Sequence, residues 1–470
     1  MNTTYRIFAL GIVFLAGCVH AKEVSFTEET GVIRHQPGQG WTTMGLNWDK
    51  LDDVVNLGGV YDRPCWSQLE PEEGVYDWSC IDGLMKLAQK HRVPFSFRIM
   101  CACAQNRNGY VTPKWLFDKG AKDDTFIIWR KGRKGEVEEF VQHVPQFDDP
   151  LFLEHHFRFL KALGERYNGN PWLAGIDLGS YGHWGEWHCH GLPPCTNRYV
   201  KPGCKPAKYV PAKVYPLEVR KQYVDAYLNN FQDSTVVFMT DDAECLEYAI
   251  GDGEGSRVGM RRDGCGSPWH FPRWIGSKAY ANVTKMGEVW KYKPIWFESY
   301  GPGKNLKEKY NNLDFTFNWM ITNHVTIVNT CPFTPLELKD DAESREYMKR
   351  IDLYAGARFV PQRARVEEID GKTVVGISFV NRGVARLHLP YEAIWEMRDA
   401  DGKVLASKVS KSDPKTWMPG AFKFRDDLPF ALKEGTSLYL RLRHVHGLFR
   451  DFKFAAKEVD ADGSLLVTAK

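Results

Sequence analysis

Short apolar runs alternate with amphipathic stretches along most of the chain. Eight runs are apolar at successive positions and rich in β-branched or aromatic residues, at 41–48, 58–63, 94–102, 173–179, 235–240, 257–262, 294–299 and 325–330. Such runs are typical of parallel strands that are covered on both faces. Between them, apolar residues recur three and four positions apart, as on one helix face, at 80–92, 150–169 and 216–231. The alternation over 36–356 predicts an α/β fold, a (β/α)8 TIM barrel.

The pattern changes after residue 356, where a helix predicted at 341–356 closes the barrel. Apolar and polar residues then alternate in segments such as "TVVGISFVNRG" and "TSLYLRLRHVHG", which is typical of half-buried antiparallel strands. Asp370-Gly371 and Asp401-Gly402 are hairpin signals between such segments. Residues 357–470 are therefore predicted to form a small antiparallel β-sandwich domain.

The first residues have the pattern of an export signal. Arg6 precedes the apolar run "IFALGIVFLAG", which is too short for a membrane-spanning helix. We interpret residues 1–21 as a signal peptide of the lipoprotein type, because "LAGC" resembles a bacterial lipoprotein box with Cys18 as the lipidated residue. Plain secretion with cleavage after Ala21 is the alternative. The protein is thus expected to be exported, either as an outer-membrane lipoprotein or as a periplasmic or secreted protein.

Charge and composition narrow the class of ligand. The chain has 62 Lys and Arg against 59 Asp and Glu, a formal net charge of +3. This balance gives no field that would favour a nucleic acid, and the only membrane contact expected is the N-terminal lipid anchor. The 16 Trp can cover cores or stack on the apolar faces of sugars. A neutral ligand such as a carbohydrate fits this composition best.

Two glutamates follow predicted strands four and seven. Glu186 lies in "GSYGHWGEWHCHG" (179–191) and Glu298 in "PIWFESYGPG" (294–303). In a barrel, such strand ends face each other across the mouth, so two carboxyl groups can flank one glycosidic bond. A gap of ~5–5.5 Å gives retention of anomeric configuration and one of ~6.5–9.5 Å gives inversion. Burial among tryptophans is expected to raise the pKa of Glu186, as a general acid requires.

Several segments resemble one known enzyme family. The segments are "YDRPCWSQLEPEEGVYDWSCIDGLMKLAQKHRVPFSF", "TPKWL", "FLKALGERYNGNPWLAGIDLG", "WFESYGPG" and "FNWMITNHVTIVNT". They resemble the glycoside hydrolase family 42 β-galactosidases and their clan A relatives. The resemblance implies hydrolysis of a β-linked, galactose-containing or related glycan by retention and without a cofactor. In that mechanism Glu298 is the nucleophile and Glu186 the acid/base.

One departure from the family pattern concerns Glu186. Clan A enzymes usually carry an Asn-Glu pair at the end of strand four, whereas this chain has Ser180-Tyr181 there, and Glu186 follows about five residues later. The acid would then be delivered by the loop rather than by the strand end. The chain therefore resembles an outlying bacterial branch of the clan.

Other side chains near strand ends are candidates for binding sugar hydroxyls, orienting the glutamates or stacking on sugar rings. They are Arg63, Trp66, Arg98, Asp177, Tyr181, His183, Trp184, Trp187, His188, Asp241, Asp242, Arg262, Asp263, Trp269, Trp296 and Tyr300. Arg–Asp pairs that stabilise the barrel and tryptophans that fill its core are the alternative interpretation.

Two other functions remain open at this point. A glycan-binding barrel without catalysis would explain the missing Asn-Glu pair. A metal-dependent hydrolase could use His183, His188 and His190, since imidazoles are zinc ligands. Their spacing matches no established zinc motif, so no metal site is predicted.

Overall fold

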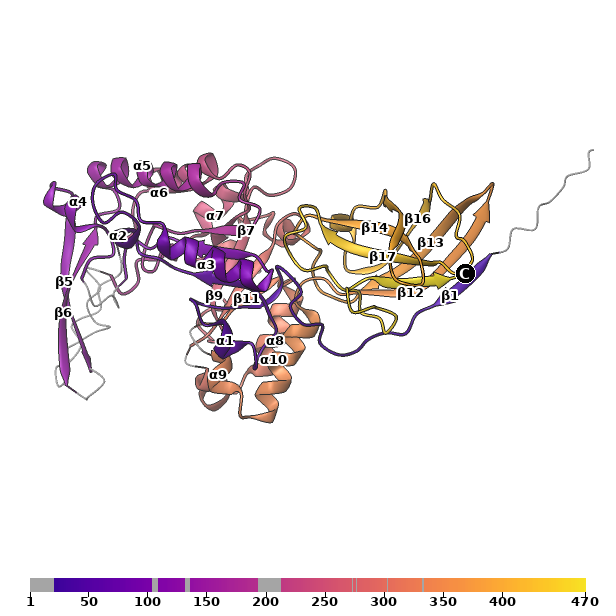
Figure 1. Ribbon diagram of the computed structural model, residues 1–470. Coiled ribbons are helices and arrows are strands. Elements are labelled where there is room, and N and C mark those ends of the chain that lie inside the picture. The colour runs from indigo at the N-terminus through magenta and orange to yellow at the C-terminus, as the bar shows by residue number, and fades with distance from the viewer. Residues whose placement is uncertain are drawn as a thin grey trace, which may run out of the picture.

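Eight parallel strands close into a barrel that forms the larger part of the molecule (Figure 1). The computed structural model describes residues 21–103, 109–131, 136–192, 213–272, 274–275, 277–301, 303–331 and 334–470. The barrel strands are β2 (Gly40–Thr42), β3 (Leu57–Asp62), β4 (Phe95–Arg98), β7 (Leu173–Leu178), β8 (Val236–Met239), β9 (Gly259–Cys265), β10 (Ile295–Ser299) and β11 (Ile327–Asn329). They pair in chain order, and β11 pairs with β2 to close the ring. All eight predicted strands are present.

Three strands end at least three residues away from their predicted C-terminal ends. β2 ends at Thr42, because the chain turns there and then forms the short helix α1 (Trp48–Leu51). β4 ends at Arg98 rather than at residue 102. β9 continues to Cys265, because the ladder with β10 resumes at the pair Ser299–Cys265 after an irregularity. This extension places Asp263 inside a strand.

Helices surround the barrel, and their apolar faces form its outer core (Figure 1). The longer helices are α3 (Ser79–His91), α5 (Pro150–Tyr167), α6 (Leu217–Asn230), α7 (Ala243–Ile250), α8 (Leu313–Thr322) and α10 (Ala342–Tyr354); the shorter ones are α2 (Trp66–Leu69), α4 (Lys114–Asp118) and α9 (Thr334–Leu338). Helix α5 shows why the sequence folds this way: Asp149 caps it by accepting a hydrogen bond from the Phe152 N–H at 3.0 Å, and Pro150 begins it. Phe152, Phe159 and Leu163 on its inner face are fully buried.

A two-stranded antiparallel ribbon stands out from the barrel between β4 and α5 (Figure 1). It consists of β5 (Asp123–Lys131) and β6 (Val137–Pro145), which pair along their whole length.

The C-terminal region contains two four-stranded antiparallel sheets. One has the order β1-β12-β13-β16 and the other β15-β14-β17-β18. Their bounds are β1 (Lys22–Ser25), β12 (Phe359–Ile369), β13 (Lys372–Asn381), β14 (Tyr391–Arg398), β15 (Val404–Val409), β16 (Gly420–Asp427), β17 (Ser437–His444) and β18 (Leu465–Ala469). Phe379 of the first sheet and Trp395 and Leu440 of the second lie in one buried cluster, so the two sheets share a core. The predicted fold class is confirmed.

Local signals and long-range pairing both shape this domain. Asp370 and Gly371 have φ angles of 51° and 71°, as a tight hairpin turn between β12 and β13 requires. The N-terminal strand β1, in contrast, pairs antiparallel with β12, with Lys22 opposite Val366. The sequence pattern did not predict that a segment next to the expected signal peptide adds a strand to the C-terminal sheet. Cys18 lies outside the described residues.

The C-terminal domain packs against the end of the barrel where the strands begin. Arg92, just before β4, donates a hydrogen bond to the Phe449 carbonyl at 2.9 Å, and Trp172, just before β7, contacts the Phe449 ring edge-on at 5.3 Å between ring centroids. Gln36, before β2, donates to the Lys453 carbonyl at 2.8 Å. Within the described part of the chain, no helix is both long enough and apolar enough to span a bilayer.

Candidate active site

The loop after β7 holds its residues in an unusual backbone conformation. Ser180, Trp184 and Trp187 have φ angles of 69°, 57° and 59°, in the left-handed region that side-chain-bearing residues rarely adopt. A Cβ on Gly185 would lie 2.8 Å from the Ile99 carbonyl oxygen, and one on Gly182 would lie 2.6 Å from the His188 carbonyl oxygen. The glycines therefore let the loop fold tightly onto neighbouring backbone, and such strain is typical of functional sites.

Hydrogen bonds fix this loop to the barrel. The Trp184 N–H donates to the Ala102 carbonyl at 2.7 Å, and the Ser180 N–H donates to the Ile99 carbonyl at 2.8 Å. The indole of Trp187 is buried and donates to the Leu178 carbonyl at 2.7 Å. The loop thereby turns Glu186 back over the barrel mouth, although Glu186 is not at the strand end.

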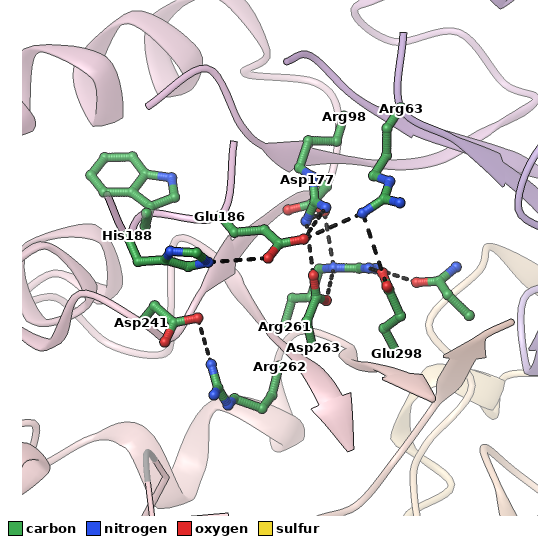
Figure 2. Close-up of polar contacts among 12 residues, drawn as sticks. Arg63, Arg98, Asp177, Glu186, His188, Asp241, Arg261, Arg262, Asp263 and Glu298 are labelled. Carbon is green, nitrogen blue, oxygen red and sulfur yellow. Dashed lines mark hydrogen bonds and ion pairs between the residues drawn. The ribbon is translucent and has the colours of Figure 1, made fainter. Parts of the chain in front are cut away.

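Glu186 is nearly buried and contacts basic side chains through both oxygens (Figure 2). Its Oε1 accepts from Arg98 Nη2 at 2.8 Å and from Arg63 Nη1 at 3.3 Å, and its Oε2 lies 3.3 Å from His188 Nε2. Burial raises its pKa well above the usual glutamate value, and the negative charge of Asp263 raises it further, while Arg98 partly opposes both. The carboxyl group therefore favours the protonated form, as expected from the sequence.

Glu298 comes from the end of β10 and is 3% exposed. Its Oε2 forms an ion pair with Arg261, and its Oε1 lies 3.9 Å from Arg63 Nη1. Glu186 Oε1 lies 3.3 Å from that same nitrogen, so the two glutamate oxygens are separated by no more than the sum of the two distances (Figure 2). This bound applies to one oxygen of each carboxyl group, and it allows the ~5–5.5 Å gap of retaining enzymes.

A buried lattice of arginines and aspartates contacts the two glutamates. Arg98 of β4 contacts Asp177 Oδ2 at 3.1 Å and Asp263 Oδ2 at 3.5 Å. Arg261 of β9 contacts Asp177 Oδ2 at 3.1 Å and Asp263 Oδ1 at 2.8 Å, and both arginine side chains are 0% exposed. Tyr61 completes the lattice by donating to Asp177 Oδ2 at 2.8 Å. Buried charges with this many partners fix the orientation of the groups they contact.

Three members of this lattice were not predicted from the sequence: Tyr61, Arg261 and Asn329, whose side chain contacts Arg261. Arg261 could have been found, because alternate residues of a strand share a face and Asp263 was already a candidate. The prediction named Arg262 instead. In the structure Arg262 makes a separate pair, donating from Nη1 to Asp241 Oδ2 at 2.5 Å and from Nη2 to His270 Nδ1 at 2.6 Å.

Several predicted sugar-binding residues lie in the core instead. Their exposed fractions are 0–2%: Trp66, Tyr181, His183, Trp187 and Trp296. Trp66 donates to Glu70 Oε2 at 2.8 Å, and Trp187 packs on Phe238 with ring centroids 4.5 Å apart. Trp66, Tyr181 and Trp187 belong to the main core, Trp296 clusters with Val237 and Ile327 of neighbouring strands, and His183 stacks on Trp184. The burial of these five side chains favours the alternative interpretation, in which they are structural.

The remaining candidates divide between structural and exposed positions. Asp242 caps α7 by accepting from the Cys245 N–H at 3.1 Å and also pairs with Arg220, so it is structural. Trp184 stacks on His183 with ring centroids 3.5 Å apart. Tyr300, just after β10, is half-buried beside Tyr310. Trp269, in the loop after β9, is 76% exposed and is the candidate ring most open to solvent.

The histidines of the 179–191 loop make contacts other than metal coordination. His183 Nδ1 lies 3.0 Å from the His190 carbonyl oxygen, and His188 faces Glu186. Across the described ranges, no three His, Cys, Asp or Glu side chains are grouped so that they could hold a metal ion. Cys189 is a free thiol, and its two loop neighbours Cys195 and Cys204 fall in the gap 193–212.

Comparisons with known proteins agree with the family resemblance. The model of glycoside hydrolase family 42, described as beta-galactosidase, matches residues 58–199, a segment that contains Glu186 and ends before Glu298. The chain is 22% identical over 134 residues to the beta-galactosidase BbgII of Bifidobacterium bifidum, which is 28% of this chain and 16% of that relative. The chain thus matches only a small part of that relative's length.

Among solved structures, the chain is similar to endo-glycoceramidase II from a Rhodococcus species, with 10% identity and a TM-score of 0.40 over 87% of this chain and all of that one. It is also similar to the xylanase XynB from Paenibacillus barcinonensis, with 9% identity and a TM-score of 0.36 over 63% of this chain and 84% of that one. The barrel fold itself rests on the observed strand pairing.

Proposed function

We propose that the protein is a glycoside hydrolase that cleaves a β-linked glycan with retention of configuration. One observation carries the proposal: Glu186, from the loop after β7, and Glu298, from β10, which lies three strands further around the barrel, converge on the same nitrogen of Arg63. The match of residues 58–199 to family 42 supports glycan hydrolysis as the reaction. The description of that family and of the Bifidobacterium relative suggests a galactose-containing substrate.

The two glutamates have different surroundings, and these suggest different roles. Glu298 contacts two guanidinium groups, which stabilise a negative charge on it, so it serves as the nucleophile that attacks the anomeric carbon. Glu186, whose pKa is raised by burial and by Asp263, donates its proton to the departing glycosidic oxygen. In the second step Glu186 takes a proton from water, the water oxygen attacks the anomeric carbon, and the bond to Glu298 breaks.

The experiment that tests this proposal compares Glu298→Gln and Glu186→Gln on aryl β-galactosides and on a panel of β-linked glycans. Loss of the nucleophile should abolish turnover of every substrate. Loss of the acid should slow substrates with poor leaving groups far more than those with activated aryl groups, because only the former need a proton. NMR of the first product should show the β-anomer.

Three outcomes separate the alternatives. Full activity of Glu298→Gln would remove Glu298 from the mechanism. Inhibition by a chelator would favour a metal-dependent hydrolase. Binding of a glycan by calorimetry, without turnover by the wild-type protein, would identify a glycan-binding barrel.

We also propose that the protein is exported and anchored through Cys18. The apolar run before Cys18 supports this, and β1 begins only at Lys22, so the proposed signal lies ahead of the first described strand. Cys18→Ser should move the protein from the membrane fraction of the producing bacterium to its soluble fraction. An unchanged distribution would contradict the lipid anchor.

A further inference from the structure

Asp263 lies between the buried lattice and the proposed acid. It is 5% exposed and comes from the extended end of β9. Arg261 Nε contacts its Oδ1 at 2.8 Å, and Arg98 Nη1 contacts its Oδ2 at 3.5 Å. Arg98 also donates to Glu186 Oε1 through Nη2 at 2.8 Å, so a single guanidinium bridges the two carboxyl groups. The geometry holds Asp263 and Glu186 side by side.

Arg98 thus places two acidic side chains next to each other in a buried site. Two ionised carboxylates in such a place repel each other, so protonation of one of them is favoured. Three arginines (Arg63, Arg98 and Arg261) face four carboxyl groups (Asp177, Asp263, Glu186 and Glu298), so one proton balances the charge of this cluster.

The proton belongs on Glu186 rather than on Asp263. Burial by itself raises the pKa of Asp263, but Arg261 and Arg98 lower it more, so its pKa ends below the usual aspartate value. The pKa of Glu186 shifts the other way. Among the residues that the structure describes, the other charged or titratable groups that face Glu186 are Arg63, His188 and Glu298. Asp263 therefore favours the ionised form and Glu186 the protonated form.

We propose that Asp263 is a positioning residue whose negative charge favours the protonated form of Glu186 before the first step and proton uptake by Glu186 in the second step. The inference rests on the proposed function. Before the first step, the carboxylate of Asp263 disfavours ionisation of Glu186. After Glu186 has given its proton to the leaving oxygen, two negative carboxylates lie side by side, and their repulsion favours removal of a proton from the attacking water by Glu186. Asp263 itself neither touches the sugar nor changes its own protonation.

The first test is the pH profile of kcat/KM for Asp263→Asn, which removes the charge and keeps the shape. The basic limb, which reports loss of the Glu186 proton, should move to lower pH by at least one unit. At neutral pH, kcat should fall more for poor leaving groups than for activated ones. Asp263→Glu should move the basic limb back toward its wild-type position, which a purely structural role would not predict.

Asp82→Asn is the matched control. Asp82 also pairs with an arginine, Arg166 at 2.6 Å, and accepts from a tyrosine hydroxyl, Tyr167 at 2.7 Å, but it lies on the outer helix α3. This variant should keep the wild-type pH profile. A folded Asp263→Asn with an unchanged basic limb would overturn the inference.

A second readout needs no turnover and therefore separates this inference from the proposed function. Infrared difference spectra of the free protein should contain a protonated-carboxyl band that is lost in Glu186→Gln. In Asp263→Asn this band should disappear at least one pH unit lower than in the wild-type protein. Persistence of the band to the same pH would overturn the inference even if no glycoside is hydrolysed. Conversely, a shifted band in a protein without activity would refute only the proposed function.

Discussion

Replacement of Gly185 by alanine tests whether the strained loop after β7 sets the position of Glu186. The new Cβ would lie 2.8 Å from the Ile99 carbonyl oxygen and 3.1 Å from the Ser180 nitrogen, at a φ angle of +70°. The left-handed conformation costs an L-residue about 1–2 kcal/mol. Crowding against two backbone atoms adds about 1–3 kcal/mol. The loop should relieve this strain by moving, and a displacement of about 1 Å at a reacting group costs about 10²-fold in rate.

Two alanine variants separate these contributions. Gly74 has a φ angle of +73°, but an added Cβ would have nothing within 4 Å, so Gly74→Ala isolates the conformational cost of about 1–2 kcal/mol. Gly83 lies within α3, where an added Cβ would again have nothing within 4 Å, so Gly83→Ala should stabilise the protein by about 0.5–1 kcal/mol. Both control variants should keep wild-type kcat/KM.

The assay combines thermal unfolding with kcat/KM on aryl glycosides whose leaving groups differ in acidity. Gly185→Ala should lower the unfolding temperature more than Gly74→Ala does. It should also lose the most activity on the poorest leaving groups, because a displaced Glu186 no longer protonates the oxygen. Wild-type kcat/KM in Gly185→Ala, together with a temperature shift no larger than that of Gly74→Ala, would refute the reasoning.

Two further predictions concern the rim and the stability of the site. Trp269→Ala should raise KM by about 2–13-fold and leave kcat unchanged, because an exposed ring that stacks on a sugar contributes about 0.5–1.5 kcal/mol. Steady-state kinetics measure both constants. An unchanged KM would show that the ring does not contact substrate. The pKa of Glu186 is higher in the folded state than in the unfolded state, so the protonated side chain is the form that suits the fold. The stability that Glu186 contributes is therefore fully present below the unfolded pKa of about 4.3 and is lost as the pH rises through the folded pKa. Glu186→Gln should therefore unfold at a higher temperature than the wild-type protein, by a margin that grows with pH over that window; a margin independent of pH in melting experiments would contradict this.

The secondary structure of the barrel was predictable because it depends on local patterns. Continuous apolar runs indicated each of the eight strands, since strands buried on both faces cannot show polar alternation. Asp370-Gly371 indicated its hairpin, because the residues in the turn adopt positive φ. Strand ends were less predictable: β9 runs to Cys265 because it pairs with β10, which lies further along the chain.

The sequence by itself determined the periodicity of strands and helices, the change to β-sheet after residue 356, and the two glutamates in glycine- and aromatic-rich turns. Only the tertiary structure decided that both glutamates meet at Arg63, that Arg261 and Tyr61 join the lattice beneath them, and that β1 pairs with β12. It also decided which tryptophans are buried and which one faces solvent. Local patterns fix the conformation of each segment, whereas these contacts join residues far apart in sequence. The contacts of the site exist only once the barrel has closed and brought its strand ends together, and the β1–β12 pair forms only once the N-terminal segment meets the C-terminal sheet.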